Sequence, residues 1–164
     1  MKMRKIIFLF VLVMSFLVQA GCSKDKPENL IATNWEQIIR TDFFSGEAPI
    51  EKAMAESVSF KVKQDGEQIT VTVTAPDICA DLLNWMEAVS DNEFTEAAME
   101  QEILRLLKES RKMEVTYTLT CSGEGESAGI AYTSEFGEAM TCGLTHFYAE
   151  VTQRILDEME GSVE

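Results

Sequence analysis

The chain has few cations, one histidine and no long apolar segment, and each shortage excludes a class of protein. Fourteen Lys and Arg residues stand against 28 Asp and Glu residues, so the formal net charge is −14. Such a surface repels phosphate backbones, and we expect no nucleic-acid partner. No Cys-x-x-Cys pair is present, so a thioredoxin-like role lacks its motif. The longest apolar stretch, residues 6–18, is shorter than the roughly 20 residues that a membrane-spanning helix needs.

The N-terminus has the parts of a secretory signal. A basic head, residues 1–5, is followed by the apolar stretch and then by small residues. The order Ala20-Gly21-Cys22 resembles the lipobox of bacterial lipoproteins. The resemblance implies that a signal peptide, residues 1–21, is removed and that Cys22 becomes a lipidated N-terminus on the extracytoplasmic face of the cell membrane.

One position leaves a second cleavage site open. Gln19 stands where the lipobox prefers an aliphatic residue, and ordinary signal peptidase cleavage after Ala20 would give a secreted protein without lipid. Cleavage before Cys22 removes three cations and no acids, which leaves 11 Lys and Arg against 28 acids and a net charge of −17. Anionic lipid head groups repel such a domain, so acyl chains would hold it at the membrane. We expect residues 22–32 to be the lipidated cysteine and a polar tether, and residues 33–164 to be one domain.

The hydrophobic periodicity predicts a two-layer α+β domain with the element order ααββααββα. Apolar residues at helical spacing predict helices at residues 33–41, from 49, at 77–89, 90–111 and 136–158, with Thr33 and Ser90 as N-caps. Period-two alternation predicts strands at residues 58–63, 69–74, 113–121 and 128–132. We expect an antiparallel sheet with helices on its apolar face and a Thr- and Lys-rich face in solvent. The segments 58–89 and 113–156 share one element order, as a duplicated ββα unit would, and the outline is similar to cystatin-like and NTF2-like folds.

The segment Gly125-Glu126-Ser127-Ala128-Gly129 resembles the nucleophile elbow of α/β-hydrolases. That motif needs a helix directly after the serine, and here the residues that follow alternate like a strand. The single histidine, His146, is the one imidazole available as a base. We therefore expect a hairpin loop, and a small serine hydrolase that uses Ser127 is the alternative function.

Two further patterns concern metals and thiols. Cys142, His146 and Glu150 are four residues apart and would share one side of a continuous helix, but a zinc ion would need a further ligand from another element. We expect a polar helix flank there, with no metal and no cofactor. Cys79 and Cys121 are the most plausible disulfide pair by direction, and buried free thiols are favoured over it.

These observations favour a membrane-anchored, non-catalytic module that binds a protein, a peptide or a small molecule. Its contact surface would be the Thr-rich face of the sheet or a groove beside it. The space between the sheet and the final helix should distinguish the ligands. A closed, packed interface favours protein contacts, and an open apolar pocket favours a small ligand.

Overall fold

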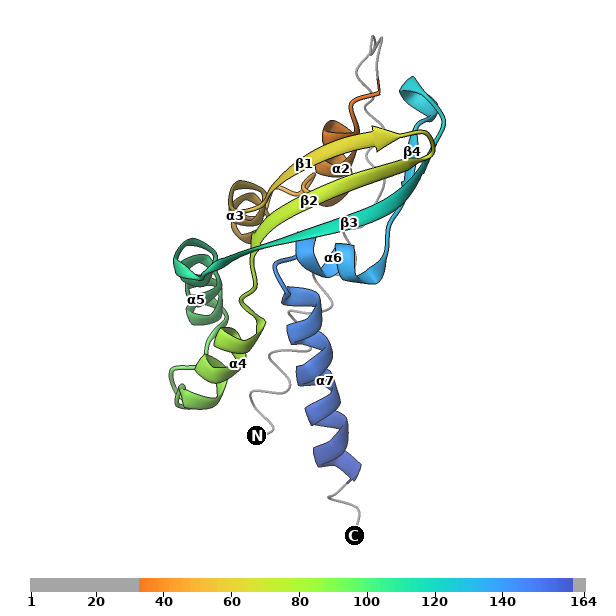
Figure 1. Cartoon of the computed structure of the whole chain (residues 1–164). Coiled ribbons are helices and arrows are strands. Elements are labelled where there is room, and N and C mark those ends of the chain that lie inside the picture. Colours follow the sequence, from red (N-terminus) through yellow and green to blue (C-terminus); the bar gives the residue numbers. More distant parts are fainter. Residues whose placement is uncertain (1–32, 161–164) are drawn as a thin grey trace.

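The computed structural model describes residues 33–160; the expected signal peptide and the expected lipid site Cys22 lie outside the described residues. The elements are α2 (Trp35–Phe43), α3 (Pro49–Ser57), β1 (Ser59–Asp65), β2 (Gln68–Pro76), α4 (Cys79–Ala88), α5 (Glu96–Glu109), β3 (Lys112–Ser122), the 3-10 turn η1 (Gly125–Ser127), β4 (Gly129–Ala131), α6 (Ser134–Met140) and α7 (Leu144–Glu160) (Figure 1). The predicted α+β class and element order are confirmed, with the last helical segment divided in two. In residues 33–160, no helix is both long enough and apolar enough to cross a bilayer.

The four strands form one antiparallel sheet in sequence order, β1-β2-β3-β4. Gly66, with φ of +61°, supplies the tight turn between β1 and β2, as the Asp-Gly pair predicts. β2 and β3 pair along nine residues, although α4 and α5 lie between them in the chain. Figure 1 shows α4, α5 and α7 gathered beyond the end of the sheet where β3 begins.

The apolar side of the sheet faces the helices and forms the core. Ile69 and Val71 of β2 are fully buried, and Phe136 of α6 and Phe147 of α7 are as well. The opposite side carries threonines, among them Thr72, whose hydroxyl lies 3.1 Å from the hydroxyl of its cross-strand neighbour on β3. The predicted division into an apolar face and a polar face is therefore correct, but the apolar face is not covered at Met113 and Val115 of β3.

Two predicted N-cap residues are wrong, and in both cases the helix begins later in the chain than predicted. Asn34, not Thr33, caps α2, because its side-chain oxygen accepts the Gln37 N–H at 3.2 Å. Thr95, not Ser90, caps α5, and its hydroxyl accepts the Ala98 N–H. The Ser90 hydroxyl does bond the Glu93 carboxylate, at 2.6 Å, but this contact closes a turn and not a helix.

The predicted final helix is interrupted at residues 141–143. Cys142 and Gly143 have φ values of +53° and +78°, in the left-handed region where an α-helix ends. The Gly143 N–H donates to the Glu138 carbonyl at 3.0 Å and closes α6. A Cβ at Gly143 would lie 2.5 Å from the Asp77 carboxylate, so the position requires glycine.

The interruption sets the direction of α7. The Cys142 carbonyl accepts the Ile78 N–H at 3.2 Å, which attaches the break to the segment between β2 and α4. From there α7 runs away from the sheet and packs beside α4, whereas the short α6 stays against the sheet (Figure 1). A continuous helix would have kept one direction along residues 136–158.

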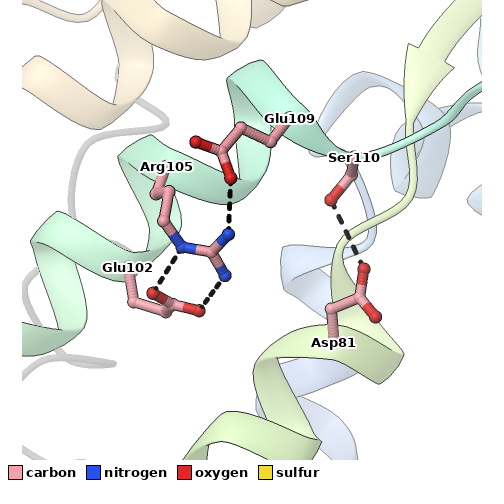
Figure 2. A network of polar contacts seen from close by, with 5 residues as sticks. All are labelled: Asp81, Glu102, Arg105, Glu109 and Ser110. Atoms are coloured by element: carbon pink, nitrogen blue, oxygen red, sulfur yellow. Dashed lines mark hydrogen bonds and ion pairs between the residues drawn. The ribbon is translucent and has the colours of Figure 1, made fainter.

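Polar side chains on the surface make contacts within α5, and one contact connects the end of α5 to α4 (Figure 2). The Arg105 guanidinium lies between the carboxylates of Glu102 and Glu109, with N–O distances of 2.6 Å to each. The bidentate pairing with Arg105 lowers the pKa of Glu102. The Ser110 hydroxyl, just after α5, donates to the Asp81 carboxylate of α4 at 3.4 Å. The Arg105 pairs lie within α5, so only the Ser110 contact joins the two helices, and such surface contacts contribute little to stability.

Candidate binding groove

An open groove lies on the helix side of the sheet, between β3 and the α6–α7 junction. Its volume is about 200 Å³. We call it the β3 groove; its lining residues are Val73, Ala75, Pro76, Asp77, Met113, Val115, Tyr117, Glu135, Glu138, Ala139, Cys142, Gly143 and His146. The floor is therefore apolar and comes from β2 and β3, and one wall is the polar side of α6 and of the break that follows it.

The groove is open because, within residues 33–160, no helix covers the first half of β3. Met113 is 48% and Val115 is 44% exposed, although both lie on the same side of the strand as Leu119, which is buried. The change along one strand face follows from the direction of α7, which leaves the sheet at residues 141–143. Apolar side chains that the alternation predicts as core are thus in contact with solvent.

The same stretch of β3 is also a free sheet edge. β4 is short and pairs only with Thr120, Cys121 and Ser122. Over residues 112–119, no other strand of the described chain lies beside β3 on that side. An apolar groove and unpaired backbone groups consequently occur side by side.

The groove carries negative charge. Within residues 33–160, three of its lining side chains are carboxylates, Asp77, Glu135 and Glu138, and none is lysine or arginine. Burial raises the pKa of the Tyr117 hydroxyl, and the charges of Glu135 and Glu138 raise it further. Burial also raises the pKa of the Cys142 thiol to about 11, with Asp77 adding to the effect. Two separate groups in the groove thus experience its carboxylates.

Aromatic packing fixes the end of the groove nearest β4. The Phe136 ring is fully buried and lies 5.4 Å from Tyr117, edge to face, and 5.4 Å from Tyr132, stacked. The Tyr132 hydroxyl donates to the Asp42 carboxylate of α2 at 2.7 Å, which ties this cluster to the first helix. Burial, followed by this bond, raises the pKa of Tyr132. α6 is therefore held firmly against the sheet.

Ser127 lies in η1, in the connection between β3 and β4. Its hydroxyl donates to the Glu124 carbonyl at 3.0 Å, and the side chain is exposed. A strand follows it, as the alternation predicts, so the strand–turn–helix arrangement of a nucleophile elbow is not formed. In Figure 1 this connection lies at the end of the sheet away from α7, the helix that carries His146. Ser127 in η1 and His146 on α7 therefore belong to different elements.

The face that Cys142, His146 and Glu150 were expected to share does not exist. Cys142 precedes α7, sits in the left-handed break and is 1% exposed, and its sulfur lies 3.7 Å from the Ser57 hydroxyl. His146 and Glu150 do share one side of α7, with 3.7 Å between Nε2 and Oε1. In residues 33–160, no group of three or more His, Cys, Asp or Glu side chains is placed to hold a metal ion.

The thiols of Cys79, Cys121 and Cys142 are free and buried. The free, buried state favoured by the sequence is thus the one observed. Burial is the main cause of the raised pKa of Cys79, and Asp77 is the next. The raised pKa values make Cys79 and Cys142 poor nucleophiles at neutral pH, because little thiolate forms.

Sequence reasoning missed the groove residues on α6. No sequence pattern singles out Glu135 or Glu138, and only their position over β3 gives them a role. The usable sequence signal was Gly143, a glycine inside an otherwise helical pattern.

No protein-family model, no curated protein and no solved structure matches the chain.

Proposed function

We propose that this chain is a lipid-anchored, extracytoplasmic binding module that holds a segment of another protein in the β3 groove. The observation that supports it is the coincidence of three features at one place. Met113 and Val115 are exposed apolar side chains, and carboxylates line the opposite wall. Among the described residues, no strand pairs with the outer edge of β3 along residues 112–119. Contacts of these three kinds are those that protein interfaces use.

The size of the groove favours a protein segment over a small molecule. An open apolar pocket would favour a small ligand, but pockets that enclose such ligands have volumes of roughly 300–1,000 Å³. The β3 groove has about 200 Å³ and is open to solvent. It accommodates one or two side chains of a chain that lies across it, and the rest of that chain would contact the edge of the sheet.

The anchor part of the proposal rests on the N-terminal residues. Lipid on Cys22 would leave the polar segment 23–32 as the connection to the domain, so the groove would operate close to the membrane surface. Replacement of the acceptor, Cys22→Ser, should move the protein from the membrane fraction to the soluble fraction and remove the mass of the acyl chains. Wild-type protein that is soluble and begins at Gly21 would contradict the anchor.

The binding part is tested separately by site-specific photo-crosslinking in intact cells. A photoreactive phenylalanine analogue at Val115 should give a discrete adduct with a second protein. The matched control is the same analogue at Leu156, which is similarly exposed, at 47%, but lies on α7 and does not line the groove. Equal labelling at both positions, or labelling at neither, would contradict a binding role for the groove.

A further inference from the structure

The backbone of β3 presents regularly spaced hydrogen-bonding groups at its open edge. The Cys121 N–H donates to the Glu67 carbonyl at 2.8 Å, so Cys121 directs its backbone groups at β2. In an antiparallel ladder this direction alternates, so the odd-numbered residues of β3 bond β2 and the even-numbered ones face the other way. Glu114, Thr116 and Thr118 therefore point their N–H and C=O groups at the unpaired edge.

The side chains of the odd-numbered residues lie on the groove side. Met113, Val115 and Tyr117 all line the β3 groove. A strand added at the open edge would place its residues opposite these three in non-hydrogen-bonded pairs, in which the side chains are closest. The groove would then receive alternate side chains of the added strand.

The charges along the groove differ from one end to the other. Glu135 and Glu138 line the groove, and burial together with their charges raises the pKa of Tyr117, so two carboxylates lie at the Tyr117 end. At the Met113 end the single carboxylate of Asp77 follows Pro76, which pairs with the cation Lys112. A cation opposite Tyr117 would therefore meet two carboxylates. A second copy of this chain, with a formal net charge of −14, would add acids to an acidic wall.

The two edges of the sheet are also protected differently. β1, the other edge strand, carries Lys61 and Lys63 on its exposed face, and charged side chains on an edge strand commonly prevent strand pairing. Along the open part of β3, the charged residues Lys112 and Glu114 lie at its start, and the exposed positions Thr116 and Thr118 that follow are uncharged. The stretch around Thr116 and Thr118 is thus less protected by charge than β1.

We propose that β3 binds an extended segment of another protein by antiparallel strand addition along residues 112–119. The segment carries a lysine or arginine opposite Tyr117 and apolar residues opposite Val115 and Met113. This inference rests on the proposed binding role of the groove and specifies its occupant. Because the strands are antiparallel, the basic residue precedes the two apolar ones in the partner's sequence.

The test uses a short synthetic peptide, acetylated and amidated, in the order Lys-Thr-Val-Thr-Val-Thr. Its control is the same composition in reverse order, which places lysine at the apolar end of the groove. Binding to the full mature domain is followed by calorimetry and by amide hydrogen exchange. The forward peptide should bind about tenfold more tightly than the reversed one. It should also slow exchange at the Glu114, Thr116 and Thr118 amides, which face the edge.

Two pairs of variants separate the contributions. Thr116→Pro removes one edge N–H and should weaken binding, whereas Thr116→Val keeps the N–H and should not. The double change Glu135→Lys and Glu138→Lys should lower affinity for the forward peptide about tenfold. The matched double change Glu67→Lys and Glu160→Lys alters the net charge equally at exposed sites outside the groove and should have little effect.

Three results would overturn the inference. Binding that is lost in Val115→Lys but unchanged in Thr116→Pro would mean that side chains occupy the groove without strand addition, and the proposed function would survive. No peptide binding, together with a crosslink from position 115, would mean a partner of different chemistry. A dimer in sedimentation that Thr116→Pro dissociates would identify a second copy as the occupant.

Discussion

Proline at adjacent positions of β3 should lower stability by different amounts, because one N–H bonds β2 and the next faces the open edge. Val115 pairs with Val73 of β2, and Val73 is 2% exposed. Val115→Pro removes the N–H that bonds the Val73 carbonyl and leaves that buried carbonyl unsatisfied. The lost bond costs about 1 kcal/mol and the unsatisfied carbonyl about 1–3 kcal/mol, so we expect a loss of about 2–4 kcal/mol.

Thr116→Pro should cost less than about 1 kcal/mol, since its N–H has no partner on β2 and proline is tolerated at sheet edges. Urea unfolding followed by far-UV circular dichroism measures both free energies. Val115→Ala and Thr116→Val are the controls; the second removes the hydroxyl that lies 3.1 Å from the Thr72 hydroxyl. Equal losses for the two prolines, or a larger loss for Thr116→Pro, would refute the assignment of alternate residues to the open edge.

Three further predictions concern the break, the buried thiol and the serine. Gly143→Ala should lower the free energy of unfolding by about 1–3 kcal/mol, because φ is +78° and the new Cβ would meet the Asp77 carboxylate. Gly137→Ala in α6 is the control; no atom lies near its Cβ position, so the substitution should raise the free energy of unfolding slightly. Chemical denaturation of the two variants measures both values. Burial raises the pKa of the Cys142 thiol from 9.0 to about 11 in the folded protein, so its contribution to the free energy of unfolding is complete below pH 9 and is lost as the pH rises through about 11. Unfolding curves at a series of pH values should show the stability difference between wild type and Cys142→Ala shrinking over that interval. A fluorophosphonate probe should label wild type and Ser127→Ala equally weakly, because a strand and not a helix follows Ser127; strong labelling that depends on Ser127 would revive the hydrolase hypothesis.

The sequence determined the strands and most of the helices because their periodicity is local. Ile69, Val71 and Val73 alternate with threonines, and a one-residue shift of register would expose all three. The strand after Ser127 was likewise predicted from alternation, and the free thiols were predicted because buried cysteines commonly act as small apolar residues. In these cases the residues near in sequence decide the structure.

The interruption of the last helix and the groove depend on residues far apart in the chain. Glycine is required at position 143 because its φ is +78° and a Cβ there would lie 2.5 Å from the Asp77 carboxylate, and periodicity contains no information on that contact. The direction of α7 then decides whether Met113 and Val115 are covered. Their alternation correctly predicts the side of the strand on which they lie, but burial depends on a second element.

The insertion of α4 and α5 between β2 and β3 has a consequence for folding. The β1–β2 hairpin needs only local contacts and should close within about 1–10 μs, whereas β3 can pair only after residues 77–111 have folded back. The contact between Ser110 and Asp81 brings the end of α5 close to the start of α4, which should speed the pairing of β3 with β2. Until β3 docks, the Val- and Thr-rich edge of β2 is unpaired. We therefore expect the intermediate that lacks β3, and not the native protein, to be the species most prone to aggregate.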